Sequence, residues 1–89
     1  MNKKQNTLIN LKKAQSHLGK IISMIEEGEY CIDTMQQNLA VIGLIRSAHQ
    51  MLMENHLNTC FEKAISSKNR KKTKQMIEEI LKVTKLFNK

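Results

Sequence analysis

Proline and tryptophan are absent from this 89-residue chain, and only three residues are glycine. Proline and glycine are the residues that most strongly interrupt helices. Aromatic residues are also scarce, since only Tyr30, Phe61 and Phe87 are present, so aliphatic side chains and six methionines must supply the packing. This composition is typical of an all-α protein.

Long apolar runs are missing as well. No stretch of 18 apolar residues occurs, which excludes a membrane-spanning helix. The first residues, MNKKQNTLINLKK, lack the apolar segment and small-residue cleavage site of a secretory signal. We therefore expect a cytoplasmic protein with no membrane partner, in which the two cysteines are thiols or metal ligands instead of a structural disulfide. The length predicts a single domain, residues 1–89, with a thin core that oligomerisation would support.

Acidic residues are missing from the first part of the chain. Residues 1–25 carry five lysines and no acid, residues 61–89 carry nine Lys/Arg against three Glu, and the whole chain has a net charge of +7. A basic surface of this kind is typical of proteins that bind nucleic acid or an anionic membrane, although it also serves solubility alone.

Enzyme motifs are missing too. The sequence has no Gly-rich phosphate loop, no paired carboxylates in an acid/base setting and no Ser-His-Asp array. We therefore expect neither an enzyme nor a small-molecule substrate.

Apolar residues recur at helical spacing in three stretches, which predict helices over about residues 5–27, 31–62 and 73–88. These positions are Leu8, Leu11, Ala14, Leu18, Ile21, Ile22 and Ile25, then Ile32, Met35, Leu39, Ile42, Ile45, Leu52 and Met53, then Met76, Ile77, Ile80, Leu81, Val83, Thr84 and Phe87. We expect the stripe of the third stretch to face a core.

The boundaries between these helices differ in character. Gly28 is suited to end the first helix, and the polar segment SSKNRKK, residues 66–72, is predicted to be a linker before the third. No helix-breaking segment interrupts the second stretch. A helix this long in so small a protein cannot be covered by its own chain, which indicates partner subunits.

The two cysteines lie far apart, and a histidine accompanies the second. His56 and Cys60 are four residues apart and share one face of a helix. Cys31 precedes His56 by a distance of about 37 Å along a helix, at 1.5 Å per residue, so one helix cannot bring all three to one metal. An antiparallel second copy would place Cys31 of one protomer level with His56 and Cys60 of the other, and two-fold symmetry would create two equal sites.

The chemistry of this donor set leaves three alternatives. Two thiolates and one imidazole form a soft site that favours Cu(I), with Zn(II) as the competitor. A structural zinc site normally requires a fourth protein ligand. The third alternative needs no metal, because two reactive thiols would sense oxidants or sulfur species.

The segments IISMIEEGEYCIDTMQQNLAV and MENHLNTC resemble the copper-sensitive operon repressor family, which also includes nickel/cobalt, formaldehyde and persulfide sensors. Its signature reads similarly to YCIDVLTQISAV followed by EEHLRHC, and the resemblance covers residues 8–62 well and the tail loosely. The matching positions are Tyr30, Cys31, Ile32, Asp33, Gln37, Ala40, Val41, Glu54, His56, Leu57 and Cys60.

The sensors of this family differ at the ligand positions. Nickel/cobalt sensors have His where Cys60 stands, and formaldehyde sensors have an N-terminal proline beside the cysteine. Persulfide sensors lack the histidine that is His56 here. Within the family, His56 therefore indicates copper.

The resemblance implies a three-helix protomer, an antiparallel helical-bundle dimer and a flat tetramer of two dimers. It implies a repressor that binds operator DNA and releases it when Cu(I) is held by Cys31 and by His56 and Cys60 of the partner subunit. Genes for copper export or storage are then transcribed. Binding of the two ligands is coupled reciprocally, so DNA must weaken copper binding by the same factor.

Two departures from the family pattern affect these implications. The family's first helix carries an arginine-rich run and a Glu-Gly-Gln segment, whereas this chain has NLKKAQSHLGK. Lysine keeps the attraction to phosphate without the bidentate fork of arginine. We therefore expect salt-sensitive DNA binding with altered specificity. The candidate DNA contacts are Lys12, Lys13, Lys20 and Arg46.

The second departure lies around the ligands. Copper sensors place Tyr beside the first ligand and Glu on the third helix, near the ligating His. Tyr30 is present here, but Met76 stands at the Glu position. Glu78 and Glu79 lie close by in the sequence and are, with Tyr30, the predicted outer-shell residues that orient the ligands.

The altered first helix keeps a second interpretation open. The chain would then be a copper- or thiol-binding module that has lost or changed its operator binding and acts through protein partners. A persulfide or oxidant sensor is a variant of the repressor interpretation. In that variant His56→Ala would leave the response intact.

Overall fold

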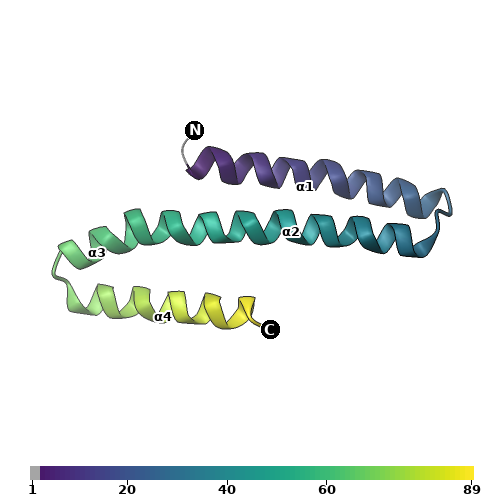
Figure 1. Cartoon of the computed structure of the whole chain (residues 1–89). Helices are drawn as coiled ribbons and strands as arrows, with labels where there is room; N and C mark the ends of the chain where they lie inside the picture. Colours follow the sequence, from purple (N-terminus) through teal and green to yellow (C-terminus); the bar gives the residue numbers. More distant parts are fainter. Residues whose placement is uncertain (1–2) are drawn as a thin grey trace. The chain divides into compact units, whose positions relative to one another are not determined.

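The computed structural model describes residues 3–89, most of which lie in helices joined by short connections (Figure 1). The elements are α1 (Lys3–Glu26), α2 (Cys31–His56), the π-helical turn η1 (Leu57–Phe61), α3 (Glu62–Ser66) and α4 (Arg70–Phe87). The predicted all-α class is confirmed, because the described residues include no strand. The chain forms two compact units, of which the first ends at Glu54 and the second begins at Asn55.

Gly28 ends α1 as the sequence predicts. Its φ of 72° lies in the left-handed region, which a glycine adopts without a Cβ penalty. The Gly28 amide donates to the carbonyl of Ile25 at 3.1 Å, and the Glu29 amide donates to that of Met24 at 2.9 Å. These are the two hydrogen bonds of a Schellman motif, and they return the chain so that α2 packs against α1.

Buried residues at heptad spacing on α1 form part of the core of the first unit. Its core consists of Ala14 and Ile21 on α1 and Val41 on α2, with Leu44 packed against them. Thr7 continues the α1 series, and each step along it is seven residues. Because seven residues are close to two helical turns, these side chains form one narrow stripe on α1.

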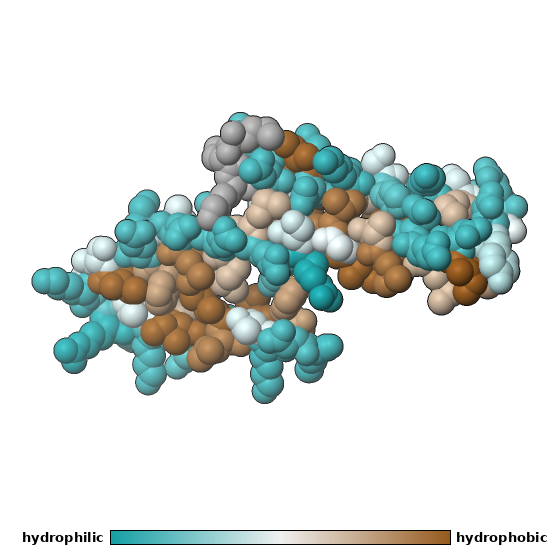
Figure 2. Space-filling view, in the orientation of Figure 1, coloured by the Kyte–Doolittle hydropathy of each residue, from teal (hydrophilic) through white to brown (hydrophobic). Residues whose placement is uncertain are grey.

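The large aliphatic residues of the three stripes are mostly exposed in the single chain, so the expectation that the third stripe faces a core is wrong for the isolated chain (Figure 2). They include Leu8, Leu11, Leu18, Ile22 and Ile25 on α1, Ile32, Met35, Leu39, Ile42, Ile45 and Leu52 on α2, and Ile77, Leu81, Val83 and Phe87 on α4. In the first unit, the residues that face the neighbouring helix are instead Ala14, Ile21, Val41 and Leu44. Exposed apolar side chains in such numbers are typical of surfaces that bind another molecule.

Within the second unit, the backbone is helical from residue 55 to residue 66. His56, Phe61 and Glu62 all have right-handed helical dihedrals, so η1 and α3 extend the helical path of α2 to Ser66. The helix therefore runs four residues beyond the predicted end at residue 62.

The predicted linker over residues 66–72 is shorter in the structure, because only residues 67–69 lie between α3 and α4. Asn69 caps α4, and its side chain accepts a hydrogen bond from the Lys72 amide at 3.1 Å. Thr73 joins the two helices by donating to the Ala64 carbonyl at 3.3 Å. The basic residues of this segment thus form the first turn of α4.

Lys68 should be replaceable by glycine with a gain in stability. Its φ of 58° is left-handed, which costs a residue with a Cβ about 1 kcal/mol relative to glycine. We expect Lys68→Gly to raise the free energy of unfolding by about 1 kcal/mol, measured by urea titration. Lys63→Gly, at an exposed position within α3, is the control and should lower it by about the same amount. Equal losses in both variants would contradict the prediction.

Candidate metal centre and nucleic-acid surface

Cys31 is the first residue of α2, and its free thiol is exposed. Its position is fixed by Tyr30, whose carbonyl accepts hydrogen bonds from the amides of Asp33 at 3.0 Å and Thr34 at 3.3 Å. The Tyr30 side chain is 67% exposed. The first predicted ligand is thus held at a helix start, where the thiol is open to a ligand or a second chain.

His56 and Cys60 lie at the other end of the long helix. His56 is the last residue of α2 and is half-buried, whereas Cys60 lies in η1 with an exposed free thiol. The hydroxyl of Thr59 donates to the Asn55 carbonyl at 2.6 Å and lies 3.6 Å from the Cys60 Sγ. A π turn is uncommon and frequently occurs at functional positions, and here it carries a predicted ligand.

Cys31 and His56 lie on the same side of α2. They are separated by 25 residues, which is about seven turns at 3.6 residues per turn, so both side chains leave the helix in nearly the same direction. Ile42 and Ile45 lie on this side between them and are 44% and 46% exposed. The two ends of one open apolar face therefore carry the predicted ligands.

One chain does not bring the three predicted ligands together. Among the described residues, no group of three or more His, Cys, Asp or Glu side chains is placed to hold a metal ion. The donor set nevertheless fits Cu(I), because it consists of two accessible thiols and one imidazole with no carboxylate. The predicted ligands therefore lie at both ends of a helix, and within the described residues of one chain they do not form a site.

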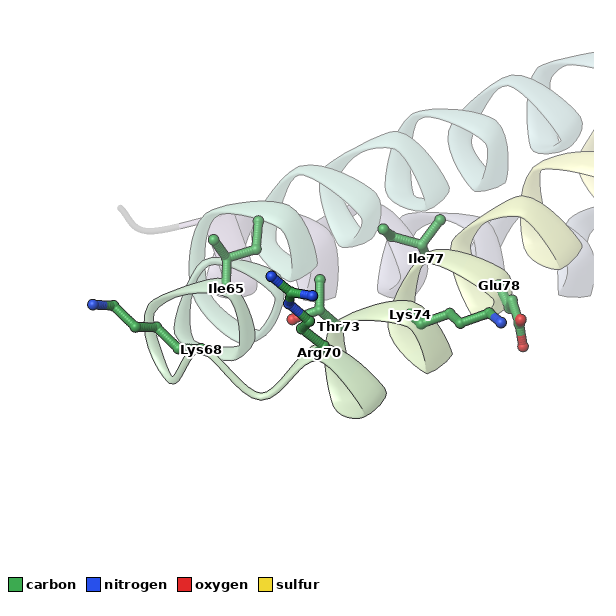
Figure 3. A pocket seen from close by; sticks show the side chains of 7 residues that line it. All are labelled: Ile65, Lys68, Arg70, Thr73, Lys74, Ile77 and Glu78. Atoms are coloured by element: carbon green, nitrogen blue, oxygen red, sulfur yellow. The ribbon is translucent and has the colours of Figure 1, made fainter.

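The predicted outer-shell carboxylates lie on α4. Glu78 and Glu79 are exposed, whereas Met76 is half-buried. Within the described part of one chain, neither carboxylate makes a hydrogen bond or ion pair with His56. Glu78 instead borders a groove of the second unit, whose other lining residues come from α3, the following turn and α4 (Figure 3). They are Ile65, Lys68, Arg70, Thr73, Lys74 and Ile77.

The predicted DNA-binding lysines are exposed on α1, and two of them lie on a different face from the exposed leucines. Lys13 and Lys20 are seven residues apart and share one face. Leu11 and Leu18 also share a face. Each precedes one of these lysines by two residues, which places the face of the leucines about 200° around the helix from that of the lysines. Lys12 is also exposed. A partner that covered the leucines would therefore leave Lys13 and Lys20 open to an anionic ligand.

Arg46 is exposed on α2 and has an interaction within its chain. It follows Leu39 by seven residues and Ile42 by four, so it continues the open apolar stripe of that helix. This position suits a contact at the edge of a subunit interface as well as a DNA contact.

The three residues that replace the family's Glu-Gly-Gln segment differ in exposure to solvent. Gln15 and Ser16 are exposed, and His17 is half-buried. The His17 Nε2 atom is fully enclosed and has no hydrogen-bond partner among the described residues. An enclosed polar atom without a hydrogen-bond partner costs stability.

Thr59 is the residue at this centre that the sequence analysis missed. The available signal was a threonine inside a helical stretch directly before a predicted ligand, because such residues often bond to the carbonyl four positions earlier.

None of the described helices combines the length and apolar character needed to cross a membrane.

Comparisons with known proteins find similar copper-sensing repressors. A relative from Mycobacterium ulcerans, described as the copper-sensing transcriptional repressor CsoR, is 43% identical over 63 residues, which are 71% of this chain and 54% of that protein. The chain thus spans about half the length of this mycobacterial relative. A Bacillus subtilis protein of the same description is 33% identical over 79 residues, which cover 89% of this chain and 75% of that protein.

A solved structure is also similar. It is the crystal structure of the copper-sensing repressor CsoR with Cu(I) from Geobacillus thermodenitrificans, with a TM-score of 0.85 and 30% sequence identity. The alignment covers 96% of this chain and 85% of that one. The family model of metal-sensitive transcriptional repressors matches residues 3–86. These proteins are transcriptional repressors and not enzymes, in agreement with the expectation from the sequence. The chain therefore belongs to the metal-sensitive transcriptional repressor family.

Proposed function

We propose that this chain is a Cu(I)-responsive repressor that binds operator DNA as an oligomer and releases it when Cu(I) is bound between subunits. The observation that carries the proposal is the placement of Cys31 and His56 at opposite ends of one open face of α2, with Cys60 in the following turn. The names of the relatives, which describe copper-sensing repressors, support the choice of metal.

The exposed apolar side chains support a second copy of the chain as the partner on this face. Ile42 and Ile45 lie between Cys31 and His56, and an antiparallel α2 would cover both while placing Cys31 beside His56 and Cys60 of the partner subunit. Each two-fold dimer would then contain two sites. Cu(I) would supply a soft cation that draws two thiolates and one imidazole together across the interface.

The chain's own residues would couple this site to DNA. Ligands from two subunits would fix the register of the antiparallel α2 helices, and α1 packs on α2 through Ala14, Ile21 and Val41. Lys12, Lys13 and Lys20 lie on α1, so a change of α2 register would move the phosphate-binding surface. We propose Arg46 as a fourth DNA contact and a tetramer of two dimers as the DNA-binding form.

Fluorescence anisotropy on the DNA upstream of the chain's own gene tests the proposal. Reduced metal-free protein should bind this DNA, and anaerobic addition of about one Cu(I) per protomer should reverse the binding, since each two-fold dimer has two sites. Zn(II) should not reverse it. Uptake of Cu(I) without specific DNA binding would instead indicate a binding module that acts through a protein partner.

The exposed thiols of Cys31 and Cys60 keep a persulfide or oxidant sensor as the second candidate. The variant His56→Ala separates the two. A copper sensor loses its response in this variant because a ligand is gone, whereas a thiol sensor keeps DNA release by an oxidant or persulfide donor.

A further inference from the structure

Thr59 is the middle residue of the π turn η1, which also contains Cys60. Its hydroxyl donates to the Asn55 carbonyl at 2.6 Å, a short hydrogen bond to the residue four positions earlier. In an α-helix this carbonyl accepts from the amide four residues on, and in a π turn it accepts from the amide five residues on. The hydroxyl therefore binds the carbonyl whose usual α-helical partner would be the Thr59 amide.

The same hydroxyl lies 3.6 Å from the Cys60 Sγ, within hydrogen-bond range for sulfur. A threonine hydroxyl has one proton, so it donates either to the Asn55 carbonyl or to the sulfur, and not to both at once. The carbonyl contact is the short one, so in the metal-free chain the hydroxyl donates to the carbonyl. A sulfur that serves as an anionic ligand is a charged acceptor, and hydrogen bonds to charged acceptors are stronger.

We propose that Thr59 is a positioning residue for the Cys60 ligand. Its hydroxyl holds the π turn through Asn55 in the metal-free chain and turns to the Cys60 sulfur when that sulfur serves as a ligand. This inference rests on the proposed function for its second half, since it assigns Cys60 to a Cu(I) site. Both contacts of the Thr59 hydroxyl lie within residues 55–60.

Two substitutions test the proposal on the full-length reduced protein. Thr59→Val keeps the shape of the side chain and removes the hydroxyl, whereas Thr59→Ser keeps the hydroxyl. We expect Thr59→Val to weaken Cu(I) binding about tenfold in competition with a chromophoric Cu(I) chelator, as is typical of lost outer-shell partners. Thr59→Ser should restore wild-type affinity. Thr84→Val, at an exposed position on α4, controls for the loss of a threonine hydroxyl elsewhere.

Two further readouts separate positioning from a general loss of stability. The ultraviolet sulfur-to-copper charge-transfer band should shift in Thr59→Val and remain unchanged in Thr59→Ser and Thr84→Val. In the metal-free protein, amide hydrogen exchange over Leu57–Phe61 should accelerate in Thr59→Val alone. Wild-type affinity, spectrum and exchange in Thr59→Val would overturn the inference.

The failure of the proposed function has a different signature. A wild-type chain that takes up no Cu(I) would overturn the proposed copper site. The exchange rates of the metal-free variants would still decide whether the Thr59 hydroxyl holds the turn at Cys60, with equal rates in Thr59→Val and wild type overturning that role.

Discussion

Protein made by refolding Cys31→Ser and Cys60→Ser chains together should bind Cu(I), although neither variant alone should bind it tightly. In a mixed dimer, the intact Cys31 of one chain meets the intact His56 and Cys60 of the other, so one of the two sites is complete. Random pairing makes about half of the dimers mixed, which restores about a quarter of the wild-type sites. Titration against a competing Cu(I) chelator measures this fraction.

The matched control for this mixing experiment uses two lesions in the same half of the site. His56→Ala and Cys60→Ser chains refolded together should restore no site, because every His56–Cys60 pair then carries one lesion or the other. Equal recovery in both mixtures would show that the ligands do not come from two chains. Tight binding by Cys31→Ser alone would remove Cys31 from the site.

The helices could be predicted from the sequence because their signals are local. Apolar residues at helical spacing, the absence of proline and the glycine at position 28 give α1 as Lys3–Glu26, close to the predicted 5–27. The start of α2 at Cys31 follows from the same turn. The polar residues 66–72 predict a linker, although the Asn69 cap and the Thr73 contact with Ala64 place Arg70, Lys71 and Lys72 in α4. Capping by a single asparagine is a weaker signal than a run of charged residues.

Burial could not be predicted in the same way, because periodicity identifies an apolar stripe without identifying what covers it. Leu11, Leu18 and Leu39 form such stripes and are exposed in the single chain, whereas Ala14 and Val41 are buried. Whether a residue is buried or exposed depends on which side chains face the neighbouring helix. The proposed ligands show the same limit, because the sequence identifies these residues, whereas the described part of one chain does not bring them together.

Removal of Lys13 and Lys20 together should weaken DNA binding and reduce its salt dependence. These exposed lysines share one face of α1, seven residues apart, so they can contact phosphates of the same duplex. The slope of log K against log salt concentration is negative, and each phosphate contact that is lost should reduce its magnitude by about 0.9. The double variant Lys13→Ala/Lys20→Ala, studied by anisotropy from low to moderate salt, measures this change.

The control for total charge is Lys82→Ala combined with Lys85→Ala on α4, which removes two charges from exposed positions outside α1. Both double variants have the same net charge, so a general electrostatic attraction would reduce the slope equally in both. A specific phosphate surface on α1 requires a larger reduction in the Lys13/Lys20 variant, together with unchanged Cu(I) affinity, because neither lysine is near a proposed ligand in the sequence. Equal slopes in the two variants would instead assign the attraction to the net charge of +7 and leave the altered first helix without a direct role in DNA binding.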